Sequence, residues 1–113
     1  MKFHHIGIAC ESITTMQAVL ADQFKACPCS EVIYDPLQKA SLQLFRMSDG
    51  ILIEMVSGEA VSAYLRRKQA LYHTCFEVTD LEDALIDFER QQALIVSPPK
   101  PAILFDQRRV AFV

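Results

Sequence analysis

The sequence lacks any excess of basic residues, because 14 aspartates and glutamates outnumber its 11 lysines and arginines and give a net charge of −3. Domains that bind nucleic acids usually carry a basic surface, so we expect no nucleic-acid partner. The sequence also lacks an apolar run of the roughly 18 residues that span a bilayer, and its first residues do not form a signal-peptide pattern. We therefore expect a cytoplasmic protein without a membrane partner.

The cysteines do not form the pattern of a disulfide framework. Cys10 and Cys75 lie inside apolar segments, and only Pro28 separates Cys27 from Cys29. Zinc knuckles space their cysteines by roughly two to four residues and need a second ligand pair, which is missing here. In a reducing compartment we interpret Cys10 and Cys75 as small buried hydrophobic residues.

A short segment that contains a histidine and several apolar residues occurs twice. Residues 3–10 (FHHIGIAC) and 71–78 (LYHTCFEV) are separated by sixty-eight positions, and each reads as a largely buried strand. Strand alternation places His5 on the same face as Gly7, and His73 on the same face as Cys75, with His4 and Tyr72 on the opposite face. Two histidines at equivalent points of a repeat can converge on one site.

Residues 12–56 predict a helix followed by three strands. Ser12 is suited to cap the helix, since apolar residues follow it at helical spacing. The strands are expected at 31–34, 40–47 and 51–56, with a tight turn between the last two. The helix is expected to bury one stripe against a sheet, formed by Ile13, Met16, Val19, Leu20 and Phe24.

The second half predicts a similar order of elements. A helix at about 60–69 leads to the repeated strand, and Asp80 is suited to cap the helix that follows. Further strands are predicted at 94–96, ended by Pro98 and Pro99, and at 108–113. The apolar stripe of this helix is formed by Leu81, Ala84, Leu85 and Phe88.

One offset relates the two halves over nearly the whole chain. At sixty-eight positions, Ser12 corresponds to Asp80 and Leu42 to Val110. The helix-capping position and the apolar alternation of the strand therefore occur at equivalent points of both halves. The 113 residues, 51% hydrophobic, suffice for one domain with a core. We predict an α+β fold with a first unit at 1–58, a connecting helix at 59–70, and a second unit at 71–113 that lacks its last strand.

Three segments together resemble the vicinal oxygen chelate superfamily: residues 5–9 (HIGIA), 51–55 (ILIEM) and 73–78 (HTCFEV). This superfamily includes glyoxalase I, methylmalonyl-CoA epimerase, extradiol dioxygenases and bleomycin-resistance proteins. The sequence is most similar to the glyoxalase and methylmalonyl-CoA epimerase branch. The resemblance implies two tandem βαβββ modules whose sheets curl around a shared cavity.

The resemblance also implies a metal site. The family's ligand positions fall on His5, Glu54 and His73, a set that suits Zn, Co, Ni, Mn or Fe. The family's fourth ligand lies on a last strand, at a position that would follow Val113 by nine residues. Without that strand the edge of 108–113 would be bare, and bare edges recruit another chain, so we expect a homodimer.

The implied activity is that of a lyase or isomerase that moves a proton next to a carbonyl, with Glu54 as the base. Gln38, Gln43 and Glu77 are candidates for polar contacts to a small-molecule substrate. Two alternatives remain open: a module of the bleomycin-resistance type that sequesters a small molecule without catalysis, and a non-catalytic interaction subunit.

Overall fold

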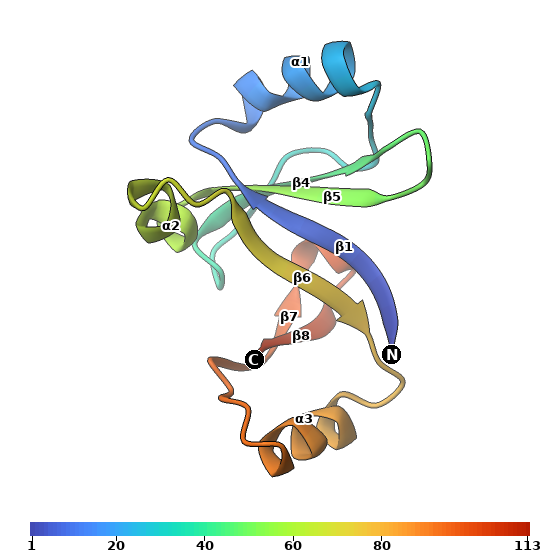
Figure 1. Cartoon of the computed structure of the whole chain (residues 1–113), viewed down its shortest axis with the longest axis vertical. Helices are drawn as coiled ribbons and strands as arrows, with labels where there is room; N and C mark the ends of the chain where they lie inside the picture. Colours follow the sequence, from blue (N-terminus) through green and yellow to red (C-terminus); the bar gives the residue numbers. More distant parts are fainter.

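The computed structural model describes residues 1–113 and has an α+β fold. A large sheet carries one helix on its outer face, and a small two-stranded sheet and a further helix lie on its other side (Figure 1). The strands are β1 (Lys2–Ala9), β2 (Cys27–Pro28), β3 (Ile33–Asp35), β4 (Ala40–Arg46), β5 (Leu52–Gly58), β6 (Leu71–Glu77), β7 (Ser97–Ala102) and β8 (Arg108–Phe112). The helices are α1 (Ile13–Phe24), α2 (Ser62–Arg66) and α3 (Leu81–Arg90), with short 3₁₀ turns η1 (Glu59–Val61) and η2 (Ile103–Phe105).

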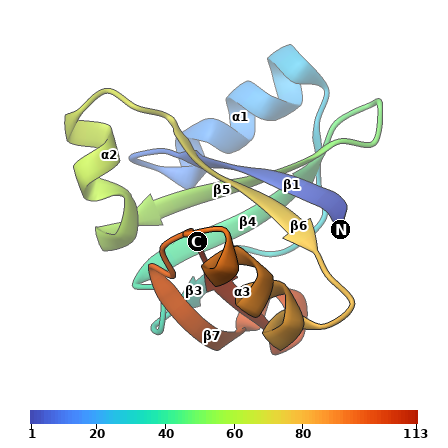
Figure 2. The same ribbon diagram turned by 60° about the horizontal axis from the view of Figure 1, so that its bottom comes forward.

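The two histidine-containing strands lie side by side at the junction of the two units. The large sheet has the order β2-β4-β5-β1-β6, with β1 parallel to β5 and antiparallel to β6, and β3 also pairs with β4. β7 and β8 pair only with each other, and Figure 2 shows α3 in front of them. In the first unit β5 lies between β1 and β4, whereas no strand lies between the corresponding β6 and β8. This arrangement confirms the predicted fold, including the second unit without its last strand.

Both predicted caps are present. The Ser12 hydroxyl accepts a hydrogen bond from the Thr15 N–H, and the Asp80 carboxylate accepts one from the Asp83 N–H. Ile13 and Leu20 are buried in a core that α1 forms with β4 and β5. Phe24 was expected in this stripe but is 52% exposed, because it is the last residue of α1 and Lys25 then turns into the left-handed region.

The predicted strand at 94–96 is wrong: those residues are irregular, and the strand β7 covers Ser97–Ala102, including three prolines. Proline lacks an N–H and is tolerated at the edge of a sheet, and β7 has β8 as its sole neighbour. The register also shifts between Ser97 and Lys100, which accommodates Pro98 and Pro99. The predicted helix at 60–69 is shorter than expected, since η1 and α2 together end at Arg66.

The buried residues form two clusters on opposite faces of the large sheet. The first lies under α1 and includes Phe45 and Met55. The second includes Leu42 and Val56 and is covered by η1, α2 and Leu104. No helix is long and apolar enough to cross a membrane.

Candidate functional site

Three strands bring His5, Glu54 and His73 together. In the pairing of β1 with β6, Gly7 lies opposite His73, and in the pairing of β1 with β5, Gly7 lies opposite Glu54. His5 is two residues from Gly7 and shares its face. The central glycine is therefore flanked by an imidazole on one neighbouring strand and a carboxylate on the other.

The donor atoms of these residues converge. His5 Nε2 lies 2.9 Å from His73 Nε2, and Glu54 Oε2 lies 3.6 Å from the first and 3.3 Å from the second. Donor atoms bound about 2.1 Å from one ion lie roughly 3.0–3.5 Å apart, so the group has the spacing that a divalent ion requires. Two imidazoles and a carboxylate also form a ligand set that first-row divalent ions accept. The residues thus fit a metal.

Burial and the Glu54 carboxylate shift the pKa values of the two histidines in opposite directions. His5 is 1% exposed and Glu54 3%. Burial lowers the pKa of His5, but the neighbouring Cys75 and Glu54 side chains outweigh this effect and raise that pKa to about 9. Burial lowers the pKa of His73, although the Glu54 carboxylate opposes this effect. His73 Nδ1 is buried without a hydrogen-bond partner.

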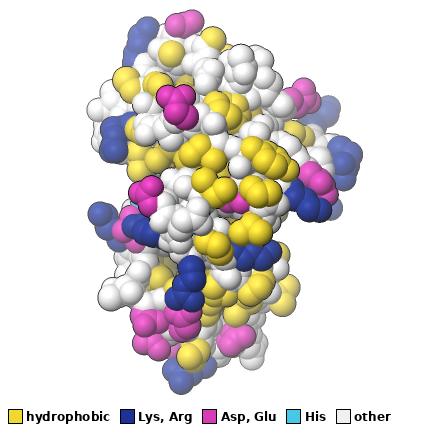
Figure 3. All heavy atoms as spheres, turned by 180° about the vertical axis from the view of Figure 1, so that it is seen from behind, with side chains coloured by type: hydrophobic (Ala, Val, Ile, Leu, Met, Phe, Trp, Pro, Cys, Tyr) yellow, Lys and Arg dark blue, Asp and Glu magenta, His cyan; other side chains and the backbone are white.

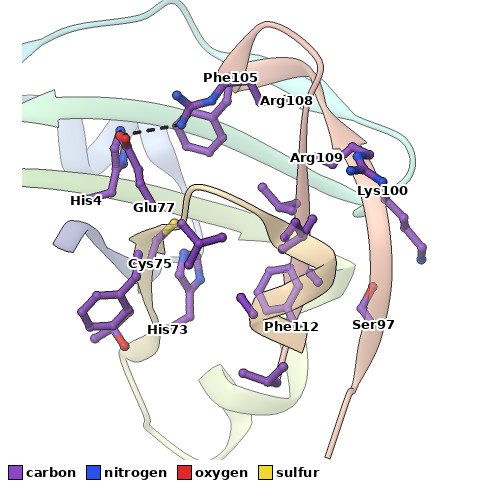
Figure 4. Close-up of a pocket in the computed structure, with 18 of the residues that line it drawn as sticks. His4, His73, Cys75, Glu77, Ser97, Lys100, Phe105, Arg108, Arg109 and Phe112 are labelled. Carbon is purple, nitrogen blue, oxygen red and sulfur yellow. Dashed lines mark ion pairs between the residues drawn. The ribbon is translucent and has the colours of Figure 1, made fainter. Parts of the chain in front are cut away.

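His4 was expected on the opposite face, and that expectation is wrong. The register of β1 against β6 shifts between Phe3 and His5, so a β-bulge at His4 breaks the alternation. His4 Nδ1 consequently lies 2.7 Å from His5 Nδ1. His4 Nε2 faces Glu77 Oε1 at 3.5 Å, and Arg108 pairs with the same oxygen at 3.7 Å. Figure 4 shows the row formed by His4, Glu77 and Arg108 at the cavity wall.

A second bulge occurs at the equivalent point of the repeat. The register shifts between Gly7 and Ile8, opposite Tyr72, which is related to His4 by the sixty-eight-residue offset. Tyr72 contacts Tyr64, His73 and Phe112 and also lines the cavity instead of the opposite face. Burial raises the pKa of its hydroxyl.

The cluster lies in a cavity of about 860 Å³ between β6, α3 and the β7–β8 sheet. Most of the residues that line it are hydrophobic. Phe105 stacks on His5 with ring centroids 5.4 Å apart, and Phe112 meets His73 edge to face at 5.6 Å. In the close-up of Figure 4 Lys100, Arg108 and Arg109 lie on the β7–β8 side of this space.

The predicted substrate-binding residues are not all at the cavity. Gln38 and Glu77 line it, although the Gln38 amide donates to Asp35 Oδ2 at 3.1 Å. Gln43 does not line it, because it points toward α1. There its amide nitrogen donates to the Ser30 carbonyl at 2.9 Å, and its oxygen accepts from Gln17 at 2.7 Å.

Cys75 differs from its predicted role as a buried hydrophobic residue. All four cysteines are free, and Cys10 is buried as expected. Cys75 is only partly buried, lies opposite His5 in the strand register and lines the cavity. Its position at the repeat equivalent of Gly7 was visible in the sequence, but its proximity to His4 depends on the bulge.

The fold recurs in solved structures of low sequence identity. A hypothetical protein from Bacillus halodurans C-125 superposes with a TM-score of 0.84 at 19% identity, over 98% of this chain and 82% of that one. Methylmalonyl-CoA epimerase from Mycobacterium tuberculosis gives 0.79 at 13% identity, over 89% of this chain and 71% of that one. A variant of the Streptomyces coelicolor epimerase, in complex with 2-nitronate-propionyl-CoA, gives 0.73 at 13% identity, over 88% and 78%.

No curated protein sequence matches the chain. The sequence model of the Glyoxalase/Bleomycin resistance protein/Dioxygenase superfamily matches residues 4–112, which is nearly the whole chain and includes every member of the His5, Glu54 and His73 cluster. The chain therefore belongs to the glyoxalase/bleomycin resistance protein/dioxygenase superfamily.

Proposed function

We propose that this chain is a divalent-metal-dependent isomerase or lyase that moves a proton on the carbon next to a carbonyl group. The observation that carries the proposal is the convergence of His5, Glu54 and His73, whose donor atoms lie 2.9–3.6 Å apart at the wall of a cavity. His5 and His73 would hold the ion through Nε2, and Glu54 through Oε2.

Each residue then has a distinct task. A bound divalent ion supplies a Lewis acid that polarises a carbonyl oxygen and stabilises the negative charge that develops there. Glu54 turns Oε2 toward both imidazoles, which leaves its second carboxylate oxygen to accept the proton from the substrate carbon. Phe105 and Phe112 pack against the two imidazoles and would limit the access of water to them.

A CoA thioester is the proposed substrate class. The Streptomyces coelicolor epimerase binds 2-nitronate-propionyl-CoA, and a further epimerase structure holds methylmalonyl-CoA, which motivates the choice. The cavity of about 860 Å³ is large enough for an acyl group. Gln38 and Glu77 would contact its polar atoms, and Lys100 would face an anionic part of the ligand at the β7 side.

The test is deuterium exchange. The protein, loaded in turn with Mn²⁺, Co²⁺, Ni²⁺ and Zn²⁺, is incubated in D₂O with methylmalonyl-CoA or propionyl-CoA, and deuterium at the carbon next to the thioester is measured by mass spectrometry. We expect incorporation that Glu54→Gln abolishes and that Glu59→Gln, an exposed carboxylate in η1, leaves unchanged. No incorporation by protein that demonstrably holds a metal would rule the activity out for these substrates.

A non-catalytic binding protein is the second candidate, and the largely apolar lining of the cavity favours it. Such a protein would bind an apolar small molecule equally well with and without a divalent ion. Equilibrium binding of propionyl-CoA and of a hydrophobic fluorescent probe, each before and after addition of EDTA, separates the two functions. The metal-dependent enzyme should lose affinity for the CoA ester in EDTA, whereas the binding protein should take the probe equally well with and without the ion.

We also propose a homodimer. β6 and β8 each have one edge without a strand partner, and unpaired edges favour association. Phe3 and Phe76 form an edge-to-face pair and are 43% and 47% exposed. Apolar side chains also gather across the middle of the face shown in Figure 3, with charged groups around them.

Light scattering after gel filtration should give the mass of a dimer, and Phe76→Lys should shift it toward the monomer. A monomer at high micromolar concentration would contradict the proposal.

The free cysteines are relevant to the cellular compartment of the protein. Neither Cys27 nor Cys29 is paired although both are exposed, and exposed thiols persist where the surroundings are reducing. A cytoplasmic location is therefore the one we propose. Alkylation of the thiols in intact cells, followed by mass spectrometry, would show whether they remain reduced.

A further inference from the structure

A second group of metal-ligating atoms lies on the other side of His5. The Nδ1 atoms of His4 and His5 are 2.7 Å apart, and donor atoms of His4, His5 and Cys75 all lie within 4.8 Å of one another. The β-bulge at His4 and the register of His5 opposite Cys75 bring this group together. Figure 4 shows His4 and Cys75 beside Glu77 at the cavity.

The chemistry of this group differs from that of the first cluster. A thiolate is a soft ligand, whereas the carboxylate of Glu54 is a hard one, so the two groups favour different ions. We propose that His4, His5 and Cys75 form a second metal site, which takes a thiophilic ion such as Cd²⁺ or Cu⁺. This inference goes beyond the proposed isomerase or lyase and does not depend on it.

The surroundings of His4 suit a ligand. If His4 binds through Nδ1, its Nε2–H points toward Glu77 Oε1 at 3.5 Å, and Arg108 holds that carboxylate from the other side at 3.7 Å. Ligating imidazoles usually donate their second N–H to a carboxylate or carbonyl in this way. Glu77, held by Arg108, is therefore the outer hydrogen-bond partner of His4, and the cavity gives an ion access to all three ligands.

His5 belongs to both sites but with different nitrogens. Nδ1 faces His4, while Nε2 faces His73 and Glu54. A neutral imidazole carries a proton on one nitrogen, so it can ligate through only one at a time. Ligation through Nδ1 leaves Nε2–H directed at Glu54 Oε2, 3.6 Å away. Occupation of the thiophilic site therefore excludes His5 from the first cluster.

The test uses the ultraviolet absorption that appears when a thiolate binds Cd²⁺. The full chain is titrated in a Cys27→Ser, Cys29→Ser background, because these two exposed thiols would bind the ion on their own. We expect a charge-transfer band at one Cd²⁺ per chain, lost in Cys75→Ser and kept in His73→Ala. His4→Ala should weaken Cd²⁺ binding by more than the roughly 10–100-fold cost of losing an outer partner.

A measurement on the unsubstituted protein guards against variants that fail to fold. Saturating Cd²⁺ should protect Cys75 from iodoacetamide, as read from the peptide masses. A band that persists in Cys75→Ser, or alkylation of Cys75 at the same rate with and without Cd²⁺, would overturn the second site. Neither result bears on the isomerase or lyase, which is tested separately, without Cd²⁺, by deuterium exchange in wild type and Glu54→Gln.

Discussion

Gly7 lies directly opposite His73 in the antiparallel pair of β1 and β6, and a Cβ added to Gly7 would overlap the imidazole ring of His73. The backbone of Gly7 is not in the left-handed region. Glycine is therefore required here because a side chain has no room, and not because of the backbone conformation. Cys75, at the repeat equivalent of Gly7, lies opposite His5 and carries a side chain there. The two halves of the site are therefore not interchangeable, because the ring of His73 occupies the volume that a side chain at position 7 would fill.

Substitution Gly7→Ala should displace the His73 ring and weaken the binding of Mn²⁺ by about tenfold or more. The overpacking should also cost about 1–3 kcal/mol of folding free energy. Gly50→Ala is the matched control. Gly50 has φ +90 with open space around its Cβ, so the change should cost about 1 kcal/mol and leave metal affinity unaltered. Calorimetric metal titration and urea unfolding of both variants give the comparison, and equal metal affinity in the two would show that the Gly7 contact does not position His73.

Strand alternation and one repeat offset predicted that His5 and His73 occupy equivalent faces and can converge on one site, and in the structure their Nε2 atoms lie 2.9 Å apart. Both signals are local in the sequence, since burial of one face imposes period two on a strand. The caps Ser12 and Asp80 were equally predictable, because the capping side chain bonds to the backbone three residues later. Glu54 required the family resemblance, since nothing in its own strand distinguishes a ligand from a solvent-facing carboxylate.

The residues that the sequence did not predict depend on pairing between distant strands. The bulges at His4 and Tyr72 exist because β1 and β6 shift register against each other, and no pattern within either strand records that shift. The orientation of Gln43 was likewise not predictable, since its amide group forms hydrogen bonds with the Gln17 side chain and with the Ser30 carbonyl on the α1 side of the sheet. The alternation within one strand does not show which face of the sheet packs against the helix and which face lines the cavity.

The stability of the metal-free protein should be greatest near pH 6.5. The pKa of His5 rises from 6.5 to about 9 on folding, so its stabilising contribution is complete below 6.5 and is lost as pH rises through about 9. That contribution is at most about 3 kcal/mol. His4 and His73 have lowered pKa values, so they reduce stability as pH falls below 6.5. Urea unfolding in EDTA across pH 5–10 tests this, and Glu54→Gln should flatten the alkaline side. If stability declined identically at alkaline pH in wild type and Glu54→Gln, Glu54 would not be a cause of the raised pKa of His5.

The two caps should contribute similar amounts to stability. Ser12→Ala and Asp80→Ala should each lower the free energy of unfolding by about 1 kcal/mol, since each removes the acceptor for a backbone N–H in the first turn. Asp80→Ala should cost slightly more, because its negative charge also interacts with the N-terminus of α3. Thr14→Ala, exposed in the first turn of α1, is the control and should change stability by less than about 0.5 kcal/mol. Equal losses in all three variants would argue against a capping role.

Metal binding at the first cluster should release a proton, and its affinity should increase with pH up to about 9. A histidine with its ordinary pKa of about 6.5 would lose the ion only as pH falls below that value. In the structure the pKa of His5 is raised to about 9, so His5 is protonated at pH 7, and the ion must displace that proton before Nε2 can ligate. Affinity should therefore improve by about tenfold per pH unit between 7 and 9. Calorimetry of Mn²⁺ binding in buffers of different ionisation enthalpy measures the proton directly. We expect close to one proton released per ion at pH 7 and fewer at pH 9.5, and release that does not change between these pH values would mean that His5 is not the residue that competes with the ion.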